Sequence, residues 1–198
     1  MNIIESIFSS PYFTKLVRTI SYYLAPLFVL LLVFMFPDYK LFLNLGNAAM
    51  LLVTANLFLK PIVVLFPFKI LKKFMHYRRE VGVLSFWMFV GHALGMFVSQ
   101  AYTIQDVLDF NLFIILGMIA GYGMIILALT SNNLAVKYLK RNWKKVQQLA
   151  YPTFFIIVAH AALAEGEIGK VFLFGGSFIV LKGLQYWKQK KRIGSAQD

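Results

Sequence analysis

Two histidines lie inside long apolar stretches of this sequence, where an ionisable side chain is costly and often marks a function or a buried partner. His92 stands in the run GHALG and His160 in the run AHAALA, whereas His76 falls in a basic stretch. If each apolar stretch is a helix that crosses a membrane, both imidazoles lie ~17 Å from the same membrane face, at a rise of about 1.5 Å per residue. Two imidazoles at equal depth on parallel helices could bind one planar group from opposite sides.

Small residues beside these histidines predict room for such a group. Gly91 and Gly95 flank His92, and alanines flank His160. A haem macrocycle needs this clearance to lie between two helices. Ligation by two histidines leaves no open iron position, which suits electron transfer better than oxygen chemistry. The pair therefore favours a haem held by His92 and His160 as axial ligands.

Other interpretations of these residues stay open. The spacing of Gly91 and Gly95 also occurs at helix–helix contacts, and Gly117-x-x-x-Gly121 is interpreted as helix packing alone. Membrane histidines can also serve as hydrogen-bonded or proton-relay groups of a transporter or a scaffold. A two-histidine metal site is a weaker rival, because we expect no Asp, Glu or Cys at the same depth to complete the coordination of zinc or iron.

The composition indicates an all-α integral membrane protein that positions these histidines. Of 198 residues, 60% are hydrophobic and 14% charged, and such a chain cannot supply the polar surface of a soluble domain. The chain has no cysteine, which excludes disulfides and iron–sulfur clusters. We expect a bundle of about six transmembrane helices, each near the ~20 residues that cross a bilayer, at 20–36, 45–68, 81–99, 111–130, 148–164 and 168–187.

The charge distribution predicts how this bundle lies in the membrane. The net charge of +12 resides in short blocks between the apolar stretches, which indicates membrane topology rather than a nucleic-acid partner. Most lysines and arginines fall in the N-terminal segment, in 69–79, in 131–145 and in the tail, so both termini are expected in the cytoplasm. The resulting division is an interfacial segment (1–19), a transmembrane domain (20–187) and a basic tail (188–198).

Three segments resemble ferric-reductase-like transmembrane domains. The stretch RREVGVLSFWMFVGH (78–92) is similar to the opening of the family's third helix, and GNAAMLLVTANLFLKP (46–61) to its second. The segment LALTSNNLAVKYLKRNWKKVQQLAYPTFFIIVAH (127–160) is similar to the fourth loop and fifth helix. The match spans roughly residues 45–165. Within the family, the chain is most similar to the MsrQ (YedZ) type, the haem-binding membrane subunits of periplasmic methionine sulfoxide reductase systems.

This resemblance implies an electron-transfer subunit of the bacterial inner membrane rather than a catalytic subunit. In that family, electrons come from a quinol or a reduced flavin on the cytoplasmic side. They pass through haem b to an extracytoplasmic acceptor, which for the MsrQ type is the molybdoenzyme MsrP. A stand-alone transmembrane ferric reductase is the alternative with the same chemistry, and a non-redox transporter or scaffold is the alternative of another class.

The resemblance also implies further cofactor contacts. Arg78 and Arg79 suit a haem propionate or the phosphate of FMN, although positive-inside topology alone would also explain them. Gln147 and Tyr151 are candidate contacts at the same face. The family usually has a histidine where this chain has Gln147, and glutamine is a poor haem ligand. The resemblance therefore implies one haem b, in the outer half of the membrane, with FMN as a further candidate cofactor.

Overall fold

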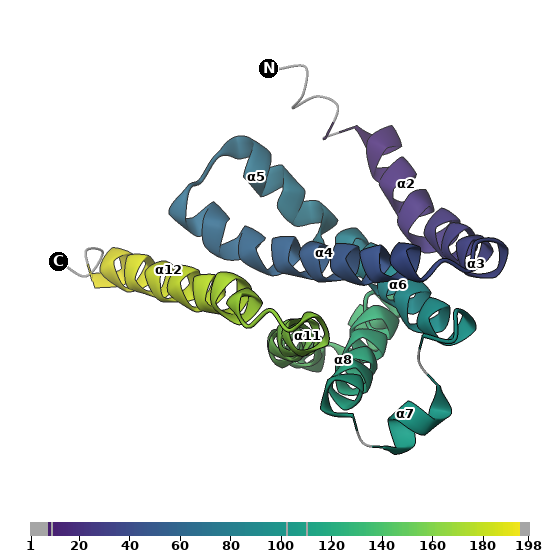
Figure 1. Cartoon of the computed structure of the whole chain (residues 1–198). Helices are drawn as coiled ribbons and strands as arrows, with labels where there is room; N and C mark the ends of the chain where they lie inside the picture. Colours follow the sequence, from purple (N-terminus) through teal and green to yellow (C-terminus); the bar gives the residue numbers. More distant parts are fainter. Residues whose placement is uncertain (1–7, 9, 102, 110, 195–198) are drawn as a thin grey trace.

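The computed structural model describes residues 8, 10–101, 103–109 and 111–194. These residues form helices and connecting turns and contain no strand, which confirms the predicted all-α membrane class. The helices, shown in Figure 1, are α2 (Pro11–Thr19), the π-helix Ile20–Leu24, α3 (Ala25–Met35), α4 (Tyr39–Leu65), α5 (Lys69–Phe74), the 3-10 turn Met75–Tyr77, α6 (Arg78–Val98), α7 (Ile104–Leu108), α8 (Leu112–Leu129), α9 (Asn133–Leu139), α10 (Arg141–Gln147), α11 (Ala150–Glu165), the π-helix Val171–Gly176 and α12 (Ser177–Gly194).

Five helical stretches among the described residues are long and apolar enough to cross a membrane. They are Pro11–Met35, Tyr39–Leu65, Lys69–Val98, Leu112–Leu129 and Arg141–Glu165. Each contains or overlaps one of the first five predicted spans. The sixth predicted span is also helical, but α12 carries several lysines and does not belong to these five.

Some boundaries differ from the predicted ones for local reasons. Helix α4 begins at Tyr39 rather than at residue 45, because the Asp38 side chain accepts a hydrogen bond from the Lys40 amide and caps the helix. The predicted loop 131–145 contains α9 and most of α10, which meet at Lys140 with a positive φ of 47°. Helix α2 continues through a π-helix into α3 without a break. Residues 1–7 and 9 of the predicted interfacial segment and 195–198 of the predicted tail lie outside the described residues.

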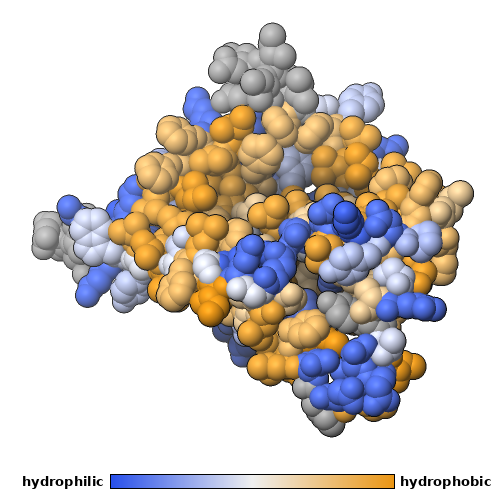
Figure 2. Space-filling view, viewed as in Figure 1, coloured by the Kyte–Doolittle hydropathy of each residue, from blue (hydrophilic) through white to orange (hydrophobic). Residues whose placement is uncertain are grey.

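Two helix pairs build the centre of the bundle. Helix α4 packs along α6, and α8 packs along α11, while α3 covers α6 and α12 lies against α4 (Figure 1). One buried cluster joins Leu57, Phe154, Val158 and Phe178. Apolar side chains cover much of the face seen in Figure 2, and hydrophilic side chains gather around α7, at the end of α12 and in groups near the centre of the view. An apolar exterior of this kind suits contact with lipid.

The basic segments meet at one end of the bundle. Arg18 of α2 contacts Glu80 of α6 at 3.1 Å, and Arg79 donates a 2.7 Å hydrogen bond to Asn133 at the start of α9. Lys188 of α12 donates to the carbonyl of Leu65 at the end of α4 at 2.7 Å. The position of these segments at one end agrees with the prediction that they lie on the same side of the membrane. That this side faces the cytoplasm stays a prediction.

Candidate functional site

The two membrane histidines lie opposite each other in the centre of the bundle. His92 extends from α6 and His160 from α11, and their ring centroids are 6.3 Å apart with 70° between the ring planes. Two metal–nitrogen bonds of about 2 Å separate the bonded nitrogens by about 4 Å, and each centroid lies about 1 Å farther back. The observed 6.3 Å therefore fits one metal ion bound between the two imidazoles.

Both imidazoles are oriented by backbone carbonyls of neighbouring helices. The Nδ1 atom of His92 lies 2.9 Å from the carbonyl oxygen of Phe42, and Nδ1 of His160 lies 2.6 Å from that of Phe113. Because a carbonyl only accepts, the proton of each neutral ring resides on Nδ1, which donates it. Nε2 of each ring then keeps a free lone pair for a metal.

The glycines that make room for the imidazoles are not the predicted ones. A Cβ on Gly91 would meet Val29 and Leu45, and one on Gly95 would meet the Phe42 ring, so both serve helix packing. The prediction that they clear space around His92 is wrong, because they point toward α3 and α4. A Cβ on Gly46 would instead lie 2.7 Å from Nδ1 of His92.

Gly117 has the corresponding position beside the second imidazole. A Cβ there would lie 2.9 Å from Cε1 of His160, whereas a Cβ on Gly121 would lie 2.6 Å from Cζ of Phe89. The interpretation of Gly117 as a packing glycine alone is therefore wrong, while Gly121 does contact a packed side chain. Sequence reasoning missed this role because the partner of each glycine lies on another helix.

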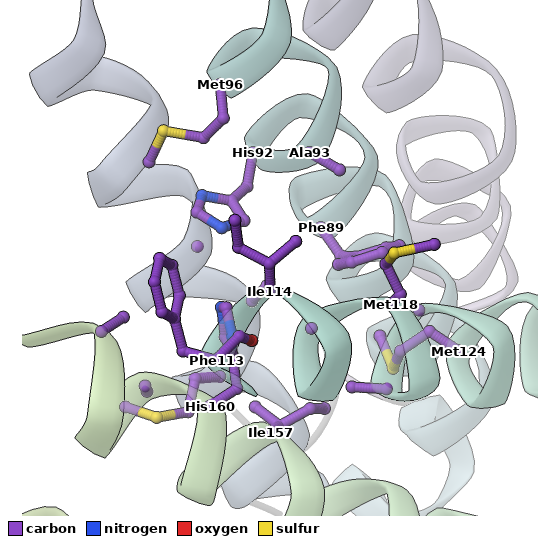
Figure 3. Close-up of a pocket in the computed structure, with 18 of the residues that line it drawn as sticks. Phe89, His92, Ala93, Met96, Phe113, Ile114, Met118, Met124, Ile157 and His160 are labelled. Carbon is purple, nitrogen blue, oxygen red and sulfur yellow. The ribbon is translucent and has the colours of Figure 1, made fainter. Parts of the chain in front are cut away.

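A cavity of about 360 Å³ surrounds the two rings, and we call it the histidine cavity. It lies between α4, α6, α8 and α11, and Figure 3 shows both rings directed into it. Most of its wall is apolar, including Phe89, Met96 and Met118. Such a site, with two neutral imidazoles and apolar walls, fits haem better than a closed zinc site, which takes four protein ligands.

Among the described residues, one carboxylate also lines the histidine cavity, five residues beyond His160 along the chain. Glu165 stands at the end of α11, but its carboxylate pairs with Lys170. Among the described residues, no group of three or more His, Cys, Asp or Glu side chains is arranged to hold a metal ion. Glu165 therefore does not turn the pair into a larger ligand set.

A second, larger cavity of about 760 Å³ lies at the basic end, and we call it the basic cavity. All four predicted contact residues line it, namely Arg78, Arg79, Gln147 and Tyr151. Arg78 and Arg79 donate to side-chain amides rather than to acids, since Arg78 Nε donates to Asn56 Oδ1 at 3.1 Å and Arg79 donates to Asn133 Oδ1. The amide of Gln147 donates to Thr130 Oγ1 at 2.9 Å, an interaction that fixes α10 against the end of α8.

Sequence reasoning missed Glu80, which also lines the basic cavity. The residue is 4% exposed, and one carboxylate oxygen accepts from Arg18 while the other has no hydrogen-bond partner in the described part of the chain. The sequence signal that could have identified Glu80 is the position of an acid directly after Arg78-Arg79, inside a basic stretch. Val53 and Met124 line both cavities, so these two side chains belong to the wall between the basic end and the histidine pair.

Comparison with known proteins agrees with this arrangement. The family described as ferric reductase like transmembrane component matches residues 45–158, which include His92 and end two residues before His160. Magnetosome protein MamZ of Paramagnetospirillum magneticum is 29% identical over 143 residues, which is 69% of this chain and 22% of that protein. No solved structure matches the chain significantly.

Two further relatives are haem-binding subunits MsrQ of protein-methionine-sulfoxide reductase. The Brucella anthropi protein is 35% identical over 82 residues, covering 39% of this chain and 37% of the relative. The Xanthomonas oryzae protein is 29% identical over 123 residues, covering 58% of this chain and 55% of the relative. The chain thus spans between about a fifth and about half of these relatives. Because the family match covers more than half of the chain, the protein belongs to the ferric reductase like transmembrane components.

Proposed function

We propose that this protein is a haem b electron-transfer subunit of the bacterial inner membrane, with His92 and His160 as the axial ligands. The observation that carries the proposal is the 6.3 Å spacing of two rings whose Nδ1 atoms are both held by carbonyls. Haem bound there would supply an iron that exchanges single electrons and has no open position. The apolar walls of the histidine cavity exclude water from such a group.

The electron donor is proposed to bind in the basic cavity. Among the described residues, five cationic side chains and a single acid, Glu80, line it. The five cations are Arg18, Lys60, Arg78, Arg79 and Lys144. This excess of positive charge attracts an anionic donor such as reduced FMN, whose phosphate the arginines can bind. Trp143 and Tyr151 add aromatic surface for a ring, and a quinol is the second donor class. The side-chain nitrogen of Gln147 donates a hydrogen bond to Thr130, which leaves its side-chain oxygen to contact the donor molecule.

The acceptor is proposed to be an extracytoplasmic reductase, such as an MsrP-like methionine sulfoxide reductase. Two relatives bear the name of the haem-binding subunit of such a system, which supports this choice. Electrons would then leave the membrane from the end opposite the basic segments. The chain itself acts as the electron-transfer subunit, and the reduction of substrate belongs to the partner.

The visible spectrum of the purified protein tests the proposal. A protein produced with ample haem should show, after reduction, a sharp Soret band and an α-band with one haem per chain. A spectrum without these bands would exclude the cytochrome and leave a transporter or scaffold.

A stand-alone ferric reductase is the second candidate, which the family description favours. The reduced protein mixed with a ferric chelate alone should stay reduced, and it should be reoxidised only when an extracytoplasmic reductase and its oxidised substrate are added. Rapid reoxidation by the chelate alone would instead assign ferric reduction to this chain.

A further inference from the structure

The two histidines are held by matching segments of two different helices. Residues 42–46 read Phe-Leu-Asn-Leu-Gly and residues 113–117 read Phe-Ile-Ile-Leu-Gly, so both share the pattern Phe-x-x-Leu-Gly. The first segment lies near the start of α4 and the second near the start of α8. In each case the phenylalanine carbonyl meets the imidazole, and the glycine follows four residues later.

Helix geometry explains why the glycine belongs four residues after the carbonyl. In an α-helix the carbonyl of residue i accepts from the amide of residue i+4, and the side chains of both lie on one face. A carbonyl oxygen has a second lone pair, which can accept the imidazole N–H. The ring reaches this lone pair only if residue i+4 has no Cβ, because a Cβ on Gly46 or Gly117 would lie 2.7 or 2.9 Å from a ring atom.

We infer that Gly46 and Gly117 are paired positioning residues, which open the carbonyls of Phe42 and Phe113 to the two imidazoles and so fix both rings as Nδ1–H tautomers. The free Nε2 atoms are then available to one metal ion between them. The Phe-x-x-Leu-Gly pattern occurs twice, once for each ring. The copy on α4 contacts His92 of α6, and the copy on α8 contacts His160 of α11. This inference rests on the proposed function for its haem readouts, but the tautomers can be measured without haem.

The first measurement is haem retention in Gly46→Ala and Gly117→Ala. Loss of such a supporting contact weakens metal binding by about 10- to 100-fold, so haem transfer to a competing apoprotein should accelerate accordingly. The reduction potential of the haem that remains should rise, because an imidazole without its N–H···O=C bond donates less charge to oxidised iron.

Matched controls separate positioning from packing. Gly91→Ala lies next to His92 on α6 and presses on Val29 of α3 at 2.7 Å, without a histidine contact. Gly183→Ala meets no atom of the described residues within 4 Å. Both controls should keep the wild-type potential and haem retention. An effect of Gly91→Ala equal to that of Gly46→Ala would attribute the loss to packing and overturn the inference.

The second measurement uses the full chain without haem, labelled with ¹⁵N-histidine in a His76→Ala background, so that two of the 3 histidines remain. Both rings should appear as Nδ1–H tautomers. Gly46→Ala should change only the His92 signals, and Gly117→Ala only those of His160. Unchanged tautomers in both variants would overturn the inference even if the protein binds haem. A wild-type protein without haem bands, but with both tautomers as expected, would overturn the proposed function alone.

Discussion

The histidine cavity and the basic cavity share Val53 and Met124 but differ in nearly every other property. The histidine cavity is the smaller, about 360 Å³ against about 760 Å³, and its walls are apolar. Its polar groups are fixed, since each imidazole donates to a carbonyl. The basic cavity instead has many cations and a buried carboxylate oxygen of Glu80 without a partner among the described residues.

This difference corresponds to two kinds of ligand. Rings that are pre-oriented in an apolar site bind a resident group tightly, because they lose little conformational entropy when the group binds. A larger, charged site attracts an anionic ligand electrostatically and can release it again. We therefore expect substitutions in the histidine cavity to change what the protein contains, and substitutions in the basic cavity to change how fast it reacts.

The largest expected effect follows removal of either ligand. His92→Ala or His160→Ala should abolish haem retention, because the remaining imidazole cannot hold six-coordinate iron alone. Haem per chain, measured from the reduced spectrum, checks this. His76→Ala is the matched control and should keep the wild-type haem content. Equal haem content in all three variants would contradict the assignment of the ligands.

A smaller effect is expected in the basic cavity. Arg78→Gln should slow reduction by reduced FMN by about tenfold, which corresponds to the loss of one charge-assisted hydrogen bond. Haem content should stay unchanged. Stopped-flow reduction of the haem bands measures the rate, and Lys69→Gln on α5, which does not line the cavity, is the control. If Arg78→Gln lost its haem, the two cavities would not have separate roles.

A third change lies between the cavities along α6. Ser85 is 0% exposed and donates a 2.9 Å hydrogen bond to the carbonyl of Ala49 on α4. Ser85→Ala should lower the free energy of unfolding by about 1 kcal/mol through the lost bond. Denaturation in detergent measures this loss, and the haem spectrum should stay the same. A changed spectrum would show that the α4–α6 contact itself controls the histidine cavity.

The smallest effect is expected at α7, outside both cavities. Hydrogen bonds from the side chain and backbone of Thr103 lower the pKa of Asp106, which forms the capping box of this helix. The carboxylate therefore stabilises the cap above its unfolded pKa, and this contribution is lost as the pH falls through the folded pKa. Asp106→Asn should lower the melting temperature slightly at neutral pH and have no effect in acid. A difference that persists in acid would indicate another cause.

The sequence was sufficient for the membrane fold. Long uncharged runs such as 112–129 must satisfy their own backbone groups in lipid, and a helix does this within one segment. The predicted start of α4 was too late because it was placed by hydropathy. The hydrogen bond from the Lys40 amide to the Asp38 side chain caps the helix at Tyr39, and such a local bond leaves no mark in the hydropathy. The predicted pair of histidines and the predicted residues of the basic cavity could be found because each is costly in lipid or matches a family motif. Their roles remain proposals.

Only the tertiary structure decided which residues serve those side chains. Gly91 and Gly95 neighbour His92 in sequence but pack against other helices, while Gly46 and Gly117 contact the imidazoles from a distance of more than 40 residues along the chain. Glu80 is buried because α2 and the α9–α10 segment meet around the start of α6. The physical reason is that hydropathy fixes where a helix crosses the membrane, whereas its rotation and depth against its neighbours depend on the packing of all side chains together.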